Sequence, residues 1–581
     1  MSSSPDFQLP VAGTFGKRAG EVLRPLWYRW AQLRSLQQLY GRHRHLQGRE
    51  FIGQLLRDLN ITLAYDPAEL RRVPAQGAFV AIANHPSGML DGLILLYLLG
   101  GTRPEFRAVA NQVLAPLLPN LTDQLTLVNP DRGAAGSNVP TVRRLLRYLQ
   151  NDIPLGLFPD GEVAYRAGVF QPAQDPAWNP TASRLLEAAR VPVVPIWLSG
   201  QNSTAFSLLG LLHPVLRTAR LPAELLNKRG QTIQVRIGQP ITPATLAALP
   251  APDRLAYLRA RVYALRPGKS QVGLFPELPA PTVVAETDPT LLEADIQQLR
   301  PGRCLLRYQQ WEVYVAKKSE IPHVLREIGW LRELTFRREG EGTQQAIDLD
   351  RYDEYYRHLF LYDRKARCLV GAYRVGRGRS ILQQYGKRGF YLHSLFRMKK
   401  ELRPLLREAL ELGRSFVREE YQKQPLPLAL LWKGIAEYIA RHPEYRYLIG
   451  PVSISNRFAP VSKAVMMEYL QRHCADPVWA DMVKPRKQFK YRPLDAPGSA
   501  SVLQAGLESL QDLQQFISGL EPGGSGVPVL LRQYIKQNAR IIGFNLDPGF
   551  SNALDGFMVL DARELPARTH RLLERYTTVL S

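Results

Sequence analysis

The sequence predicts an α/β chain of two domains. From about residue 48 to 265, short apolar runs that suit buried strands alternate with segments of helical periodicity. A proline-rich stretch without periodicity follows, from Arg266 to Pro289. The 581 residues, 45% of them hydrophobic, suffice for at least two cores. We therefore expect domains at residues 1–265 and 300–581, joined by a linker over residues 266–299.

An amphipathic helix is the first element expected, in residues 22–47. Leu26, Trp30, Leu33 and Tyr40 recur near helical spacing, and arginines surround them. Such a helix can lie in a membrane interface, with its tryptophan among the headgroups. It can also pack on its own domain, and the two arrangements are compatible.

The apolar runs of the first domain are expected to form strands, and the periodic segments helices. The strands are predicted at residues 77–83, 153–159, 191–197 and 232–238, and the helices at 141–150 and 182–190. Binding and catalytic groups in α/β sheets lie at strand ends. We therefore expect the reactive side chains of this domain directly after its strands.

A histidine and an aspartate follow the first of these strands, in the segment NHPSGMLDG from Asn84 to Gly92. In such a pair the aspartate holds one ring nitrogen and supports the imidazolium that forms when the other nitrogen takes a proton from a hydroxyl. We expect His85 and Asp91 to be catalytic, with His85 as the base. The structural alternative for His85 is a histidine at a strand end that caps a helix.

Three further segments accompany this one, VNPDRG from Val128, LFPDGEVAYR from Leu157 and VPVVPIW from Val191. Together, and in this order, the four resemble the motifs of the 1-acylglycerol-3-phosphate acyltransferase family. Members of that family pass an acyl group from a thioester to an alcohol of a lipid. The resemblance implies substrate-binding roles for Asn84, Arg132, Phe158, Pro159, Asp160, Gly161 and Glu162.

Two departures from the family pattern bear on the acceptor. Five residues lie between His85 and Asp91, one more than is usual, and Gly88 is expected to absorb the extra residue through a positive φ. The third motif reads Phe-Pro-Asp-Gly-Glu, and Arg166 is displaced from the place where the family has an arginine for a phosphate. The acidic Glu162 suggests an acceptor without a phosphomonoester. Arg132 has an alternative reading as a solvated loop residue.

Four segments of the second half belong together: IGWLRELTFRREGEG, AIDLDRYDEYYRHLFLYDRKARCLVGAYRV, LELGRSFV and LLWKGIAEYIARHPEYRYLIGPVSIS. They resemble the acyl-carrier-dependent branch of the GNAT acyltransferases, which includes acyl-homoserine-lactone synthases and ornithine-lipid N-acyltransferases. The last segment is especially close to the ornithine-lipid enzymes. The resemblance implies site residues at Arg332, Phe336, Asp348, Asp350, Asp353, Glu411 and Arg414.

The chemistry of N-acylation assigns roles to some of these residues. The amine must be neutral to attack a thioester, so a carboxylate must remove a proton, and Glu411 is our candidate for this base. The three aspartates can hold a cationic amino acid. The structural alternatives are a strand glutamate paired with Arg414, and Asp350 as the N-cap of a helix that begins at Arg351.

The segment after Val417 bears on the acyl donor. A CoA-dependent GNAT enzyme has a glycine-rich loop there, whose backbone N–H groups bind the pyrophosphate. This chain instead has REEYQKQPLPLALLW, in which two prolines remove donors. We therefore expect no bound cofactor and an acyl group carried on the phosphopantetheine of acyl carrier protein, with acyl-CoA as the alternative.

The formal net charge of +23 indicates an acidic partner. Anionic membrane lipids and acyl carrier protein fit, whereas nucleic acid is not expected, because zinc-finger spacing, an RNP-like motif and a basic recognition helix are missing. Three dispersed cysteines indicate a reducing cytoplasm and predict no metal site. No secretory signal is visible, and the longest apolar run, Leu93 to Leu99, is far below the roughly 20 residues that span a bilayer. We expect a cytoplasmic protein, peripheral on the inner face of the membrane.

Two acyltransferase halves on one chain resemble the bifunctional ornithine-lipid synthases of bacteria. The resemblance implies N-acylation of an amino acid with a 3-hydroxyacyl group, followed by O-acylation of the 3-hydroxyl. Ornithine is the expected amino acid, and glycine and lysine remain open. The alternatives are a lysophosphatidic acid acyltransferase with an accessory GNAT-like domain, and a non-catalytic membrane-binding scaffold.

Overall fold

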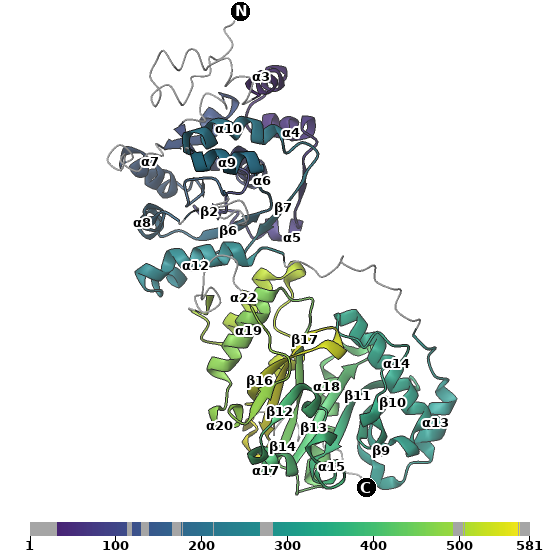
Figure 1. Cartoon of the computed structure of the whole chain (residues 1–581). Coiled ribbons are helices and arrows are strands. Elements are labelled where there is room, and N and C mark those ends of the chain that lie inside the picture. The colour runs from purple at the N-terminus through teal and green to yellow at the C-terminus, as the bar shows by residue number, and fades with distance from the viewer. Residues whose placement is uncertain are drawn as a thin grey trace, which may run out of the picture. The chain divides into compact units, whose positions relative to one another are not determined.

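The chain packs into two units in the computed structural model (Figure 1). The first unit holds Met1–Pro267 and Pro493–Gly526, and the second holds Gly268–Arg492 and Val527–Ser581. The described residues between 503 and 526 therefore belong to the first unit. The structure describes residues 32–112, 119–128, 139–165, 176, 178–212, 214–267, 283–491, 503–504, 506–567 and 569.

A seven-stranded sheet forms the centre of the first unit, in the order β1-β7-β6-β2-β5-β3-β4. All its pairings are parallel except that of β6 with β7. The central strand β2 is buried along its whole length, as its uninterrupted apolar run predicts for a strand covered on both faces. The strands are β1 (Thr62–Ala64), β2 (Val80–Ala83), β3 (Arg107–Asn111), β4 (Leu125–Val128), β5 (Leu155–Leu157), β6 (Val193–Leu198) and β7 (Thr232–Ile237).

Helices surround this sheet, with α6 packed against β3 and α12 against β6. The two helices predicted in this unit are present as α7 and α8. The helices described in this unit are α3 (Leu33–Arg42), α4 (Gly48–Asp58), α5 (Pro67–Leu70), α6 (Met89–Thr102), α7 (Val139–Gln150), α8 (Pro180–Ala189), α9 (Thr204–Leu212), α10 (Pro214–Leu226), α11 (Pro243–Ala247), α12 (Ala251–Ala264) and α22 (Leu510–Leu520).

The expected N-terminal amphipathic helix is described only in part, because residues 22–31 lie outside the described ranges. Within α3, Leu36 and Tyr40 are buried in the core of the unit. The ring of Tyr40 meets that of Phe51 edge to face, with 5.3 Å between the centroids. The described part thus packs on its own domain, and contact with a membrane stays a prediction. No helix of the described residues is both long enough and apolar enough to cross a bilayer.

Helix α22 joins the first unit although it comes from the second half of the sequence. Its apolar residues Leu513, Phe516, Ile517 and Leu520 are buried. The guanidinium of Arg261 lies 4.6 Å from the centre of the Phe516 ring. At the carboxyl end of the helix, the carbonyls of residues 519 and 520 accept hydrogen bonds from arginines 72 and 236 of the first unit. These contacts satisfy the terminal carbonyls that a helix leaves unpaired.

The second unit is built on an eight-stranded sheet, in the order β16-β17-β14-β13-β11-β10-β9-β8. Only β13 and β14 pair in parallel. A separate pair joins β12 (Phe396–Met398) to β15 (Val483–Pro485). The strands of the large sheet are β8 (Cys304–Tyr308), β9 (Trp311–Lys317), β10 (Arg357–Asp363), β11 (Cys368–Arg377), β13 (Ala409–Val417), β14 (Tyr447–Ile454), β16 (Arg540–Asp547) and β17 (Ala553–Asp561).

Two long helices cover opposite faces of this sheet. Phe360 of β10 packs into the core cluster that includes residues of α14. Leu359, the residue before Phe360, lies on the other side: a Cβ added at Gly434 of α18 would contact the side chains of Leu359 and Val313. Successive strand residues point to opposite faces, so α14 and α18 lie on different sides. The helices described in this unit are α13 (Pro289–Gln297), α14 (Pro322–Glu339), α15 (Gly378–Tyr385), α16 (Leu392–Leu395), α17 (Arg403–Arg407), α18 (Pro425–Ala440), α19 (Pro460–His473), α20 (Pro477–Ala480) and α23 (Val529–Lys536).

The predicted linker is shorter than expected, because residues 289–297 form helix α13. Asp288 caps this helix by accepting the N–H of Thr290, and Pro289 occupies its first turn. Proline is favoured at that position, where a backbone N–H has no partner inside the helix. The proline read as part of a linker therefore begins a helix.

Candidate active sites

The histidine and aspartate that are expected to be catalytic meet directly after β2. The ring nitrogen Nδ1 of His85 lies 2.9 Å from Oδ2 of Asp91. Asp91 is fully buried, while 16% of the His85 side chain is exposed. In the tautomer with its proton on Nδ1, the basic nitrogen of the ring is Nε2. The two side chains are thus oriented toward each other, and the histidine is within reach of an acceptor.

Backbone hydrogen bonds fix the aspartate. Its Oδ2 also accepts the N–H groups of Ser87 at 2.8 Å and Gly88 at 2.9 Å. Gly88 has a φ of 80°, as expected from the extra residue between histidine and aspartate. Asp91 lies in the first turn of α6, where the helix dipole favours a negative charge. The wider turn therefore still delivers the carboxylate to the imidazole.

Asn84 anchors the turn to the sheet. Its side-chain amide donates to the carbonyl of Leu198 at 2.9 Å, and its side-chain oxygen accepts the N–H of Leu198 at 2.7 Å. Leu198 ends β6, the parallel neighbour of β2. The role of Asn84 in this structure is to hold the histidine loop at the carboxyl edge of the sheet.

The third motif follows β5, the other parallel neighbour of β2, and so lies at the same edge. The ring of Phe158 stacks on the His85 ring, with 4.1 Å between the centroids. The backbone N–H of Ala164 donates to the carbonyl of His85 at 2.9 Å. Pro159 and Asp160 are buried.

The remaining residues of this motif are more accessible. Gly161 is exposed with a φ of 65°, and Glu162 is half-buried. Arg132 and Arg166 lie outside the described residues. The substrate-binding roles expected for Arg132, Gly161 and Glu162 stay predictions.

Lys228, near this pair, was not singled out from the sequence. Its side chain is 1% exposed, and its ammonium donates to the carbonyl of Gln201. Burial lowers the pKa of Lys228, although the nearby charges of Asp91 and Glu224 act to raise it. No motif marks this lysine, because it lies more than a hundred residues beyond the aspartate in the sequence.

In the second unit, the expected acidic residues bind arginines of the same chain. Arg332 pairs with Asp353 at 2.9 Å, and Arg374 pairs with Asp350 at 2.7 Å and with Asp353 at 3.4 Å. Burial works against the charge of Asp353, yet the two arginines hold its pKa below the usual range. Asp350 also caps the 3₁₀ turn Arg351–Glu354 by accepting the N–H of Tyr352.

Arg414 completes this arrangement. Its Nε lies 3.1 Å from Oδ2 of Asp348, and its Nη2 lies 4.0 Å from Oδ2 of Asp350. A bulge in β13 places two residues opposite one of β11, and Arg414 takes a φ of 49° there. The bulge re-aims its side chain toward the aspartates, not toward Glu411. Phe336, the remaining site residue expected here, is buried against Phe550, with ring centroids 5.1 Å apart.

Glu411 is buried and surrounded by donors. Its carboxylate accepts the hydroxyl of Tyr356, the N–H of Tyr391 at 3.1 Å and the N–H of Leu392 at 2.7 Å. Burial raises its pKa to about 7. In this arrangement Glu411 holds the backbone of residues 391–392, and that segment supplies Tyr391 to a neighbouring cavity.

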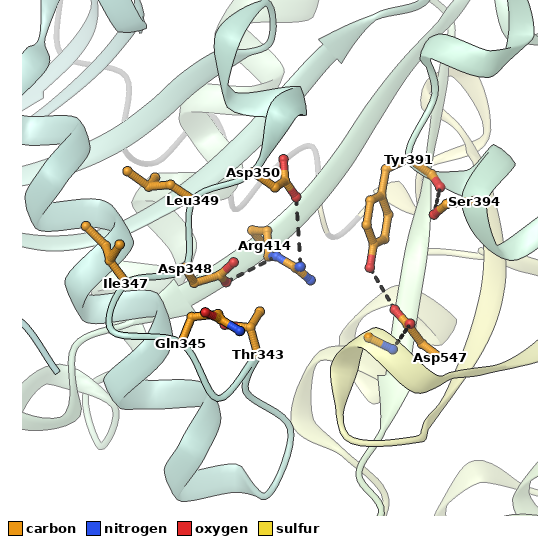
Figure 2. Close-up of a pocket in the computed structure, with 11 residues that line it drawn as sticks. Thr343, Gln345, Ile347, Asp348, Leu349, Asp350, Tyr391, Ser394, Arg414 and Asp547 are labelled. Atoms are coloured by element: carbon orange, nitrogen blue, oxygen red, sulfur yellow. Dashed lines mark hydrogen bonds and ion pairs between the residues drawn. The ribbon is translucent and has the colours of Figure 1, made fainter. Parts of the chain in front are cut away.

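This cavity has a volume of about 350 Å³ (Figure 2). It brings Asp348, Asp350 and Arg414 together with two residues that the sequence did not single out as site residues, Tyr391 and Asp547. The hydroxyl of Tyr391 donates to Asp547 Oδ2 at 2.8 Å. The other lining residues are Thr343, Gln345, Ile347, Leu349, Ser394 and Gly549.

Beside the cavity, the hydrogen-bonded pairing of β13 with β14 ends. Their parallel pairing covers only Ala409–Glu411 and Tyr447–Ile449, although both strands continue beyond these residues. Strand edges without partners can accept an extended group. The second unit thus combines charged side chains in a cavity with an open strand edge, and the first combines a buried carboxylate with an accessible imidazole.

One family model matches a region of each unit. Residues 21–270 match the model of a family described as Acyltransferase, and residues 331–433 match that of the Acetyltransferase (GNAT) domain. A protein named glycine N(alpha)-acyltransferase from Phocaeicola vulgatus is 24% identical over 303 residues, which is 49% of this chain and 89% of that protein.

Two further proteins are similar to parts of the chain. A lyso-glycine lipid O-acyltransferase from Bacteroides thetaiotaomicron is 26% identical over 204 residues, 34% of this chain and 73% of that protein. The crystal structure of the 1-acyl-sn-glycerophosphate acyltransferase from Thermotoga maritima aligns with 13% identity and a TM-score of 0.23, covering 39% of this chain and 88% of that one.

The two matched regions contain the two clusters of polar residues described above. His85 and Asp91 lie within the first region, and Arg332, Asp353 and Arg414 lie within the second. The chain is therefore an acyltransferase that carries an Acyltransferase domain over residues 21–270 and a GNAT domain over residues 331–433.

Proposed function

We propose that this enzyme makes a diacylated amino-acid lipid in two steps. In the second unit, an amino-acid nitrogen attacks the thioester carbon of a 3-hydroxyacyl donor, a C–N bond forms, the C–S bond breaks and the thiol leaves with a proton. In the first unit, the 3-hydroxyl of that product attacks the carbon of a second thioester and His85 takes its proton; a C–O bond forms, the C–S bond breaks and the departing thiolate receives the proton from His85. The geometry of His85 and Asp91 is the observation that carries this proposal.

The amino acid is the finer part of the proposal. The sequence resemblance points to ornithine, whereas the names of two relatives, a glycine N(alpha)-acyltransferase and a lyso-glycine lipid O-acyltransferase, favour glycine. Because both names refer to glycine, we take glycine as the acceptor to test first and ornithine as the second.

Acyl carrier protein is the proposed donor partner. The turn after β13 leads into α18, whose first residues include Pro425 and Pro427. These prolines supply no N–H groups for a pyrophosphate. Phosphopantetheine on a carrier protein has a single phosphodiester, so it does not need them. The proposed place of action is the inner face of the cytoplasmic membrane.

A lipid profile tests the proposal. The chain is expressed in a bacterium that lacks aminolipids, beside His85→Ala. The wild type is expected to yield a phosphorus-free diacylated aminolipid, whose mass identifies glycine or ornithine. His85→Ala is expected to accumulate the monoacylated compound, because only the second acylation needs the imidazole.

Other outcomes would overturn the proposal. A lysophosphatidic acid acyltransferase would consume lysophosphatidate and yield no aminolipid. A non-catalytic scaffold would leave the profile unchanged in both strains. Equal amounts of the diacylated product with and without His85 would remove His85 from the reaction.

A further inference from the structure

The cavity of Figure 2 has charged groups of both signs on its wall. Asp348, Asp350 and Asp547 supply carboxylates, and Arg414 supplies a guanidinium. The residues come from a loop after α14, from β13 and from the end of β16. A free α-amino acid is a zwitterion, so a cavity with both signs matches its two ends.

Two of the three carboxylates are already neutralised. Asp348 pairs with Arg414 at 3.1 Å, and Asp350 pairs with the buried Arg374 at 2.7 Å. A ligand ammonium that competed for either aspartate would take from a buried arginine the nearer of its two carboxylate partners, which is costly. These two aspartates therefore orient arginines and are poor sites for a ligand cation.

Asp547 differs from Asp348 and Asp350 in its hydrogen-bond partners. Its side chain is nearly buried, at 6% exposure, and its oxygens accept only neutral donors, the hydroxyl of Tyr391 and the N–H of Gly549. Among the described residues, no arginine, lysine or histidine nitrogen lies within 4.0 Å of this carboxylate. It is the carboxylate of the cavity that remains for a cation.

Arg414 lies on the wall between the paired aspartates and the Tyr391–Asp547 pair (Figure 2). Its guanidinium carbon is 5.2 Å from the centre of the Tyr391 ring and 4.5 Å from that of Phe550. Aromatic rings on its faces leave its edges for in-plane hydrogen bonds. A guanidinium held in this way suits a carboxylate, which it can bind through two parallel N–H groups.

We propose that this cavity binds the amino-acid acceptor, with the acceptor carboxylate on Arg414 and its ammonium on Asp547. The assignment rests on the proposed function and adds a specificity to it. Because Asp547 is the one cavity carboxylate without a cationic partner in the described chain, the site selects acceptors with a single ammonium group, such as glycine, over dibasic ones such as ornithine.

Direct binding and turnover together test this assignment. Glycine and ornithine are titrated calorimetrically into the full-length enzyme, and N-acylation is followed with a 3-hydroxyacyl carrier protein. Asp547→Asn keeps an oxygen for the N–H of Gly549 and removes the charge. It is expected to weaken glycine binding and raise the KM for glycine about 30-fold, with the KM for the thioester unchanged, because charge-assisted hydrogen bonds are strong.

Asp561→Asn is the matched control. Asp561 ends the neighbouring strand β17 and likewise caps a 3₁₀ turn, by accepting the N–H of Arg563 at 3.0 Å. It does not line the cavity. Its variant is expected to bind glycine as the wild type does, so a general effect of losing an aspartate cap is separated from the loss of the cavity charge.

The results distinguish failure of the cavity assignment from failure of the proposed function. Unchanged glycine affinity in Asp547→Asn, or ornithine binding as tight as glycine binding, overturns the cavity assignment even if aminolipid is made. Glycine binding that depends on Asp547 without any N-acylated product overturns the proposed function and leaves the cavity assignment standing. A tenfold or greater preference for glycine that is lost in the variant supports both when product forms.

Discussion

One oxygen of Asp91 accepts three hydrogen bonds, from the His85 ring and from the N–H groups of Ser87 and Gly88. Such bonds fix the carboxylate before substrate arrives, so the imidazole needs no reorganisation to become charged. The stacked ring of Phe158 restrains the other side of the imidazole. These hydrogen bonds and the stacked ring explain how a solvent-accessible histidine can be a well-oriented base.

Glu411, unlike His85, is a buried group whose hydrogen bonds hold the protein's own backbone. Three donors occupy its carboxylate, and its burial raises its pKa to about 7. A direct encounter with the acceptor would require it to release the turn that carries Tyr391. Its place in the structure is that of a positioning residue, while its expected role as base stays a prediction.

The raised pKa makes stability depend on pH. Below about 4.5 Glu411 is protonated in both folded and unfolded chains. Between about 4.5 and 7 the folded protein keeps a proton that the unfolded chain releases, so the free energy of unfolding falls as pH rises, by about 1 kcal/mol per pH unit. Denaturant unfolding of the wild type and Glu411→Gln at pH 5, 6 and 7 measures this.

The variant isolates this residue from others that titrate in the same direction. Burial raises the pKa of Asp555 to about 7 and that of Glu341 to about 8. Both remain in Glu411→Gln, whose stability is therefore expected to fall less steeply with pH than that of the wild type. Identical slopes would show that Glu411 does not hold its proton in the folded state.

At the scale of elements, the position of the loop that carries His85 depends on neighbouring strands. The turn after β2 is tied to β6 through Asn84, and it contacts the turn after β5 through the His85 carbonyl. Parallel strands bring all three carboxyl ends to one edge. The strand order therefore determines which loops share the site.

Helix α22 gives an element-scale prediction. Phe516 is 4% exposed and lies against Arg261. Truncating a buried phenylalanine costs about 3–5 kcal/mol, since it leaves a cavity. Phe516→Ala is therefore expected to lower the temperature at which O-acylation activity is lost, with N-acylation activity retained longer in the same sample.

The control for this prediction is Val529→Ala. Val529 is 55% exposed at the start of α23, so its truncation is expected to change stability by no more than about 0.5 kcal/mol. Loss of both activities at one temperature in Phe516→Ala would contradict the assignment of α22 to the first unit.

At the scale of the whole molecule, the charge of +23 is the dominant property. A charge of this size attracts acidic surfaces before any specific contact is made. Both proposed partners, anionic lipid and acyl carrier protein, are acidic. The attraction is screened by salt, which provides a test.

We predict that the enzyme sediments with vesicles that contain phosphatidylglycerol and not with vesicles of phosphatidylcholine alone. Raising the ionic strength from about 0.1 M to about 1 M shortens the screening length from about 10 Å to about 3 Å and is expected to release the protein. Binding that is equal for both vesicles and insensitive to salt would show that apolar contacts, and not charge, bring it to lipid.

The sequence by itself determined the α/β class, the four strands of the first unit named in advance and the meeting of His85 with Asp91. These features are local: strand patterns repeat over a few residues, and His85 and Asp91 are six positions apart. A turn between a strand and a helix brings such residues together whatever the rest of the chain does.

Only the tertiary structure decided the partners of Glu411, the pairing of the aspartates with arginines, the place of Asp547 and the return of α22 to the first unit. Tyr391 and Asp547 are 156 residues apart, and their contact depends on the order and register of the strands between them. Ion pairs across a sheet follow no regular spacing in the sequence. Any arginine could in principle pair with any aspartate, and only the fold determines which two side chains meet.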